Sequence, residues 1–383
     1  MSIVALLECK SYDINFVMEK VNAGVDALGG WDRFVHPHDT VLLKVNLIGP
    51  KASDTAAVTH AEFVRAIVRI LRDRNCTVWI GDSSGGAIGG IAPTARAFQV
   101  SGYESVAEEE GAVVKNFDRE GVVAVTPQSG CEETMYIAKP IFDADVVINL
   151  PKLKTHSAGI FTGAVKNVFG CIPGLKKAKY HRMAPDPADL GQILCDIHQA
   201  GKFHLHIMDG IIAMQGEGPT AGSVYPAGKL LVSDDPLALD IVAAGMLGLH
   251  VSDIPILETA QKRGLGEGNP ERIQLAGDYA AIPLLKNFKL PKRFIKPVKR
   301  NRKALVKVID FFQARPHINP KKCRKCNLCA ESCPVQAIDK ETRKIDYTVC
   351  IECMCCHELC MYQAVELKSA HAAAGLLSGL MRR

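Results

Sequence analysis

The 383-residue sequence contains no long hydrophobic run and no recognisable secretion signal. No apolar stretch reaches the roughly 18 to 20 residues that cross a bilayer, which predicts that no segment spans a membrane. Glu8, Lys10 and Asp13 interrupt the N-terminal stretch where a signal peptide would be apolar. We therefore expect a cytoplasmic protein.

Motifs for nucleotides and nucleic acids are also missing. The glycine-rich stretch after Asp82 lacks the Lys-Ser/Thr pair of a P-loop and the full spacing of a dinucleotide-binding fingerprint. Nothing resembles a nucleic-acid-binding fold, so we expect no nucleic-acid partner. The net charge is only +5, and residues 286–307 hold ten Lys or Arg and no acid. We interpret this basic stretch first as a solvated linker and next as a docking site for an acidic electron carrier, with an anionic membrane surface or nucleic acid as further alternatives.

Short Val, Ile and Leu runs alternate with amphipathic helical stretches over residues 2–278. This alternation predicts an α/β fold, a mainly parallel sheet with helices on both faces. Open sheets of this kind bind ligands beyond the carboxyl ends of their strands, so we expect a cleft there. The expected strands cover residues 3–8, 40–45, 77–81, 112–115, 146–150, 204–208 and 229–232. The expected helices cover residues 15–28, 61–74, 187–200, 236–247 and 254–263.

Nine of the fourteen cysteines lie between Cys323 and Cys360, which indicates metal ligands rather than disulfides. Eight of them form two motifs with the spacing Cys-x2-Cys-x2-Cys-x3-Cys, and an offset of 27 residues maps the first motif onto the second. In this motif three thiolates hold one iron–sulfur cluster and the fourth reaches the other. The repeat therefore predicts two [4Fe–4S] clusters. Their ligands would be Cys323, Cys326, Cys329 and Cys360 for one, and Cys350, Cys353, Cys356 and Cys333 for the other.

Two alternatives qualify this prediction. Paired Cys-x2-Cys motifs also build four-thiolate zinc sites, although the tandem spacing favours clusters. Cys355 breaks the 27-residue relation, and we interpret it as a spare thiol that could compete with Cys356. Residues 318–367 resemble the bacterial two-cluster ferredoxin domain. This resemblance implies one-electron transfer at low potential, with a partner such as ferredoxin or flavodoxin as electron donor or acceptor.

These patterns divide the chain into four parts. Residues 1–280 form the expected α/β domain, and residues 281–315 a basic, proline-containing linker with one helix near 304–313. Residues 316–368 form the expected small α+β, ferredoxin-like two-cluster domain. Residues 369–383 form a tail with a weakly amphipathic pattern, which we interpret as a short packing helix.

Polar residues gather after several expected strands. They include the stretches 44–46, 59–60, 81–86, 151–156, 166–171 and 209–219. In this order, ahead of a ferredoxin segment, these stretches resemble the iron–sulfur family called domain of unknown function 362, over residues 4–277. That family has no agreed reaction, so the resemblance implies no catalytic role for any residue.

Lys152, Lys154, His156 and Lys166 concentrate positive charge after the expected strand at 146–150, and we take them as candidate catalytic residues for an anionic ligand. A desolvated lysine or His156 could donate protons when electrons arrive. The alternative is a solvated basic loop. Candidate substrate-binding residues are Lys44, Asn46, His60, Asp82, Asn167 and Asp209.

Other polar residues have simpler interpretations. A glycine-rich turn explains residues 83–86 about as well as an anion-binding loop, and Asp209 and Glu217 are as well explained as capping acids. A single histidine such as His60 or His181 is more often structural than catalytic, and Cys171 is expected to be buried and inert.

Two hypotheses follow. In the first, the protein is an oxidoreductase whose clusters relay electrons to an anionic organic substrate in the α/β domain. In the second, it is an electron carrier or a maturation factor for a metal cofactor, and the α/β domain only docks on a partner. A third possibility, a further metal in the α/β domain, requires His60, His156 or His181 to converge. An enclosed pocket around Lys152, Lys154 and His156 would favour the enzyme, and a flat exposed face would favour docking.

Overall fold

The computed structural model describes residues 2–86, 92–174, 176–292 and 314–369. In this part of the chain, ten strands form one mixed sheet with the order β12-β1-β11-β10-β7-β2-β3-β4, and β8 and β9 extend it beside β10. The pairs β12–β1, β10–β7, β7–β2, β2–β3 and β3–β4 are parallel, whereas β11 runs antiparallel to both of its neighbours. The strands are β1 (Ser2–Glu8), β2 (Thr40–Lys44), β3 (Thr77–Asp82), β4 (Val113–Asn116), β7 (Val146–Asn149), β8 (Lys152–His156), β9 (Ile160–Thr162), β10 (Phe203–Gln215), β11 (Ser223–Ser233) and β12 (Ile273–Gly277).

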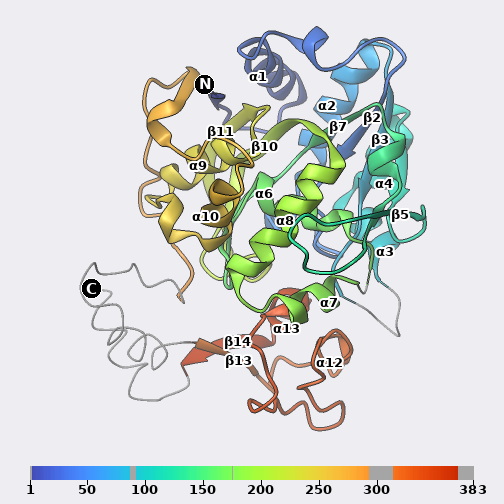
Figure 1. Ribbon diagram of the computed structural model, residues 1–383, viewed down its shortest axis with the longest axis vertical. Helices are drawn as coiled ribbons and strands as arrows, with labels where there is room; N and C mark the ends of the chain where they lie inside the picture. The colour runs from blue at the N-terminus through green and yellow to red at the C-terminus, as the bar shows by residue number, and fades with distance from the viewer. Residues whose placement is uncertain (1, 87–91, 175, 293–313, 370–383) are drawn as a thin grey trace.

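Helices cover both faces of this sheet (Figure 1). Successive side chains of a strand point to opposite faces, so Leu42 packs into one hydrophobic core and its neighbours Val41 and Leu43 into the other. The first core receives α6 (Ala164–Asn167), α8 (Pro187–Gly201), α9 (Pro236–Met246) and α10 (Pro255–Lys262); the second receives α1 (Ile14–Asp26), α2 (Ala61–Asp73), α3 (Thr94–Ser101) and α4 (Tyr103–Glu110). The predicted α/β fold is confirmed. Shorter elements at its margin are α5 (Pro140–Asp143), α7 (Lys176–Met183) and the hairpin of β5 (Val122–Val125) and β6 (Met135–Ala138).

Residues 314–369, which we call the cysteine-rich segment, form a separate small unit. Its strands β13 (Ala314–Ile318) and β14 (Val365–Ser369) pair antiparallel, and its short helices are α12 (Leu328–Glu331) and α13 (Cys355–Leu359). The 27-residue repeat is present in the backbone: Lys325, Asn327 and Gln336 have positive φ, and so do the residues 27 positions later. The two halves therefore fold alike.

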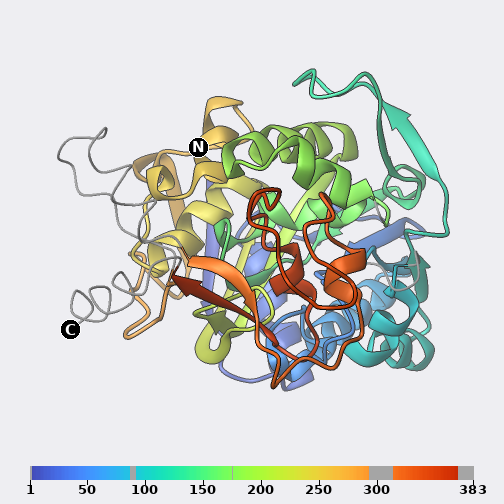
Figure 2. The same ribbon diagram turned by 90° about the horizontal axis from the view of Figure 1, so that it is seen from below.

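The cysteine-rich segment lies at one end of the α/β region, beside α7, and covers the middle of its lower surface (Figures 1 and 2). Thr220 Oγ1 donates a hydrogen bond of 2.6 Å to the Glu358 carbonyl oxygen across this contact. Gly85 also lies against Leu359: a Cβ atom there would approach Leu359 Cδ2 to 3.2 Å. The segment is thus seated on loops that follow β3 and β10.

All seven expected strands and all five expected helices are present, although β10 and β11 are longer than expected. The alternative interpretation of Lys152, Lys154 and His156 as a solvated basic loop is wrong, because these residues lie on the buried strand β8. The expected helix near 304–313 lies outside the described residues, as does the tail after Ser369. None of the described helices is long and apolar enough to cross a bilayer.

Candidate functional site

Two small cavities in the cysteine-rich segment are each lined by four of the motif cysteines. One cavity, which we call the outer thiol cavity, is lined by Cys323, Cys326, Cys329 and Cys360. The other, the inner thiol cavity, is lined by Cys333, Cys350, Cys353 and Cys356, and also by the spare thiol Cys355. Each cavity therefore receives three thiols from one motif and the fourth from the other, in the combination that the repeat predicts.

The surroundings of the thiols suit iron–sulfur clusters. The Ala337 amide donates to Cys333 Sγ at 3.2 Å, and its repeat mate Ala364 donates to Cys360 Sγ at the same distance. Apolar side chains such as Ile318, Ile338 and Val365 pack around the cysteines, and amide bonds to sulfur together with low exposure tune cluster potentials. In the described part of the chain, no three His, Cys, Asp or Glu side chains are grouped around the position of a single metal ion.

Three neighbouring parallel strands of the α/β region end in buried polar residues. Lys44 ends β2, Asp82 ends β3 and Asn149 ends β7, each at most 2% exposed. Lys44 Nζ lies 3.0 Å from Asp82 Oδ2, and burial raises the pKa of Asp82 against the opposing effect of the Lys44 charge. Gly170 closes over this pair, because a Cβ atom there would lie 2.0 Å from Asp82 Oδ1.

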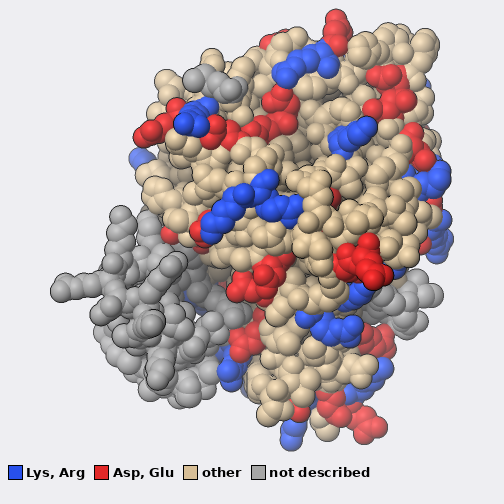
Figure 3. All heavy atoms as spheres, in the orientation of Figure 1, with Lys and Arg blue, Asp and Glu red and all other residues tan. Residues whose placement is uncertain are grey.

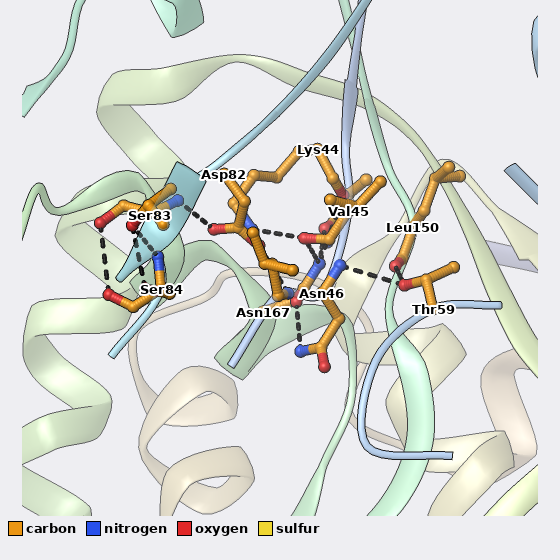
Figure 4. Close-up of polar contacts among 12 residues, drawn as sticks. Lys44, Val45, Asn46, Thr59, Asp82, Ser83, Ser84, Leu150 and Asn167 are labelled. Atoms are coloured by element: carbon orange, nitrogen blue, oxygen red, sulfur yellow. Dashed lines mark hydrogen bonds and ion pairs between the residues drawn. The ribbon is translucent and has the colours of Figure 1, made fainter. Parts of the chain in front are cut away.

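A chain of side-chain amides links these strand ends to Lys154. Figure 4 shows its middle part, where Asn46 and Asn167 meet. Lys154 Nζ donates to Asn46 Oδ1 at 2.6 Å, and Asn46 Nδ2 donates to Asn167 Oδ1 at 2.8 Å. Asn167 Nδ2 in turn donates to Asn149 Oδ1 at 2.7 Å. Because every amide both donates and accepts, the chain fixes the orientation of Asn46 and holds Lys154 in one position.

A cavity of about 380 Å³ lies where the α/β region meets the cysteine-rich segment. From the α/β region its lining includes Asn46, Lys154, His156 and Lys166, and from the cysteine-rich segment it includes Cys333. One wall therefore carries positive charge and the opposite wall carries a thiol of the inner thiol cavity. We call this space the interface cavity. Its lining also includes apolar side chains, among them Leu47, Ile48, Phe169, Pro219 and Leu359.

Lys154 and Lys166 are two of the cationic residues that line the interface cavity. Burial, together with the nearby Lys166 charge, lowers the pKa of Lys154 to about 7. Burial also lowers the pKa of Lys166, whose ammonium contacts the Phe169 ring at 6.0 Å. Among the described residues, Lys166 Nζ has no hydrogen-bond or ion-pair partner. An anion in the cavity could therefore bind Lys166 without displacing an existing partner.

His156 and Glu358 meet across the same interface. The amides of Ala158 and Gly159 donate to His156 Nδ1, so this nitrogen carries no proton and the neutral ring is protonated at Nε2. His156 Nε2 lies 3.1 Å from Glu358 Oε1, although the two are not aligned as a hydrogen bond. Burial lowers the pKa of His156 and raises that of Glu358. Both effects favour the uncharged forms of the two groups.

A second cavity of about 230 Å³ adjoins this wall. It shares His156, Lys166 and His181 with the interface cavity and is also lined by Cys353, a thiol of the inner thiol cavity. His60 lies elsewhere, stacked on the Tyr12 ring at 3.6 Å. Of the three histidines considered for a further metal, His156 and His181 therefore share both cavities, and His60 does not join them.

The structure separates the sequence-predicted residues into two groups. Lys154, His156, Lys166, Asn46, Asp82 and Asn167 line the interface cavity. Lys152 lies outside it, in a buried ion pair of 2.6 Å with Asp209. Tyr12 donates to Asp209, and so does the backbone amide of His60. Lys152, Asp209 and His60 therefore form a second group, which lies outside the interface cavity and whose polar atoms bond to one another and to Tyr12.

Glu358 and Lys177 were missed by the sequence reasoning. Lys177 Nζ donates to the carbonyl oxygen and to Oγ of Ser83, which holds the glycine-rich loop against α7, and burial lowers its pKa to about 8. Glu358 is the repeat mate of Glu331, and both line the interface cavity. The sequence contained one signal for Glu358: a glutamate recurs at the same position in both halves of the repeat. Cys171 is fully buried, as expected, and burial raises its pKa to about 12.

Two sets of four thiols beside an α/β sheet with a charged cavity define an iron–sulfur protein. The family model described as domain of unknown function (DUF362) matches residues 41–245, and the model of a 4Fe-4S binding domain matches residues 316–339. The chain belongs to the DUF362 family and binds at least one [4Fe–4S] cluster. A relative from Synechocystis sp., called a thylakoid-associated protein, is 33% identical over 293 residues, which is 76% of this chain and 88% of the relative.

Similarity to solved structures is weak. The lactate racemase apoprotein from Thermoanaerobacterium thermosaccharolyticum aligns with a TM-score of 0.39 and 11% identity over 64% of this chain. A Thermotoga maritima protein aligns with a TM-score of 0.37 and 14% identity over 60% of this chain. The chain covers 57% of each of these two proteins, and scores at this level carry no argument about function.

Proposed function

We propose that this protein is an oxidoreductase that uses two [4Fe–4S] clusters to reduce an anionic organic substrate in the interface cavity. One observation carries the proposal: Cys333, a thiol of the inner thiol cavity, lines the same space as Lys154, His156 and Lys166. A substrate in this space would lie beside both an electron source and buried cationic groups. In the proposed division, residues 1–280 form the substrate domain and residues 316–368 the cluster domain.

The number of clusters is supported by the two thiol cavities, each lined by four motif cysteines and each with an amide bonded to its fourth motif sulfur. Clusters of this type would supply single electrons at low potential. A low-potential carrier such as ferredoxin or flavodoxin would be their electron source. Two such electrons and two protons convert one substrate molecule to its reduced form.

The substrate class follows from the lining of the interface cavity. A carboxylate or phosphate would accept charge-assisted hydrogen bonds from Lys166, which has no other partner among the described residues, and from Lys154. Leu47, Ile48 and Phe169 would contact the apolar part of the molecule. The volume of about 380 Å³ is at the lower end of the range for ligand pockets, which suits a small molecule.

Lys154 is the best placed proton donor. A pKa of about 7 leaves its side chain partly protonated near neutral pH, so it can release a proton and take up another. Its hydrogen bonds to Asn46 and to the Ala57 carbonyl keep it at one point on the cavity wall. His156, with its proton on Nε2, is the second candidate. The enclosed position of both residues favours the enzyme over a protein that only carries electrons.

The test begins with anaerobic purification followed by iron and sulfide analysis and spectroscopy of the reduced protein. The proposal predicts about eight irons per chain, and a colourless, zinc-loaded protein would overturn it. Small carboxylates and phosphates are then screened for binding by calorimetry. Lys166→Met should weaken binding by about tenfold or more, because a hydrogen bond to a charged group contributes about 1.5 to 3 kcal/mol. Lys139→Met, which changes an exposed lysine immediately before α5, is the matched control, and equal affinities in the two variants would refute the assigned site.

A further inference from the structure

The two thiol cavities differ in their access to solvent. The inner thiol cavity faces the α/β region: Cys333 reaches the interface cavity and Cys353 the cavity beside it. The outer thiol cavity is lined by residues of the cysteine-rich segment alone. Cys326, one of its thiols, is exposed, whereas the other thirteen cysteines are buried or half-buried. The outer thiol cavity is therefore the one that a partner in solution can approach.

The loop around Cys326 is strongly basic. Lys321, Lys322, Arg324 and Lys325 are all exposed. Lys322 Nζ lies 2.9 Å from Glu366 Oε1, but the other three cations have no ion-pair partner among the described residues. Their charges are therefore available to a partner.

The internal repeat supplies a built-in comparison. The equivalent positions of the second loop, 27 residues later, are Thr348, Val349, Ile351 and Glu352, which include no cation. Both loops have the same backbone turns, with positive φ at Lys325 and at Glu352. Cluster binding alone therefore does not require the four cations. The second loop packs against the α/β region through Ile351 and Glu352, whereas the first faces solvent.

We propose that residues 321–326 are the docking surface for the acidic face of a small one-electron carrier protein, an inference that rests on the proposed electron-transfer function. The carrier is oxidised by one electron, which enters the protein at the outer thiol cavity, and no bond or proton changes in this step. Opposite charges steer such encounters and raise association rates by about 10- to 1,000-fold at low salt. The loop carries four cations within five residues, and Tyr362 is the exposed aromatic ring near it. Insertion into a lipid surface needs several apolar side chains, so this composition suits contact with a charged protein face better.

Across the face shown in Figure 3, Lys and Arg are interspersed with Asp and Glu. A control variant can therefore carry the same change in net charge at exposed positions of the α/β region. Arg96, Arg119 and Arg272 are exposed and lie outside both cavities of the interface.

The experiment uses the anaerobic, cluster-loaded full chain and measures the rate of cluster reduction by stopped-flow absorbance. The electron donors are a reduced acidic ferredoxin and, separately, dithionite. For the wild type we expect a ferredoxin rate that falls steeply as salt rises to about 0.5 M, where charges are screened within a few ångströms. Lys321→Glu/Arg324→Glu/Lys325→Glu should be at least about tenfold slower at low salt and nearly independent of salt. Arg96→Glu/Arg119→Glu/Arg272→Glu should behave like the wild type.

The outcomes separate the two proposals. If dithionite fails to reduce clusters in the wild type, the electron-transfer function is wrong. If dithionite reduces all three proteins alike but ferredoxin reduces the two triple variants at equal rates, the docking surface is wrong. Binding of the same proteins to vesicles of anionic lipid is measured as a third test. If the loop variant loses vesicle binding while its reduction by ferredoxin is unchanged, the basic loop recognises lipid and the docking proposal is overturned.

Discussion

Lys154→Met should change how the stability of this protein depends on pH. The Lys154 side chain is 1% exposed, and burial lowers its pKa from 10.5 to about 7. Each pKa unit corresponds to about 1.4 kcal/mol, so burying the charged form lowers the free energy of unfolding by about 5 kcal/mol. This effect is fully present below pH 7, where the folded and unfolded chains both hold the proton.

The sign of the pH dependence follows from proton binding. Between pH 7 and about 10 the unfolded chain holds the Lys154 proton and the folded chain does not, so the stability of the wild type rises with pH. Methionine has nearly the same shape and does not titrate. The stability of the variant relative to the wild type should therefore fall by about 2 kcal/mol between pH 7 and about pH 9. The lost hydrogen bonds to Asn46 and Ala57 lower the stability of the variant by an amount that does not depend on pH.

Urea unfolding under anaerobic conditions measures this difference. The two tryptophans, Trp31 and Trp79, lie in the α/β region, so their fluorescence reports on the region that contains Lys154. Lys139→Met controls for the substitution itself, since that side chain is exposed. If the stability difference between wild type and Lys154→Met is the same at pH 7 and pH 9, Lys154 does not have a lowered pKa and its assignment as proton donor is wrong.

Two further predictions concern the thiol cavities and the strand ends. Cys326→Ser/Cys360→Ser removes two thiols of the outer thiol cavity and should retain about four irons per chain. Cys326→Ser/Cys333→Ser removes one thiol from each cavity and should retain almost none. If iron analysis finds more iron in the second variant than in the first, the interleaved ligand sets are wrong. Gly170→Ala should destabilise the protein by about 1 to 3 kcal/mol, because the added methyl group would overlap the buried Asp82 carboxylate. An unchanged midpoint of urea unfolding would show that the strand ends can rearrange around Gly170.

Much of the chemistry can be predicted from the sequence because the relevant constraints are local. The cysteine spacing places three thiols on one turn-rich loop, and the 27-residue repeat identifies which fourth thiol completes each set. The alternation of apolar runs and amphipathic stretches predicts the α/β class for the same reason, because the hydrophobic periodicity of a strand or a helix is a property of a short segment. The structure reproduces these features, down to the matched hydrogen bonds of Ala337 and Ala364 to sulfur.

The tertiary structure alone decided which polar residues share the site. Lys152, Lys154 and His156 lie on one face of β8, where positions two residues apart are separated by about 6 to 7 Å. Lys152 consequently reaches Asp209, Lys154 the interface cavity and His156 the cysteine-rich segment. The contact of His156 with Glu358 joins residues about 200 positions apart and depends on how the cysteine-rich segment seats on the sheet. No local pattern encodes that arrangement, because it arises from the packing of two units that each fold around their own core.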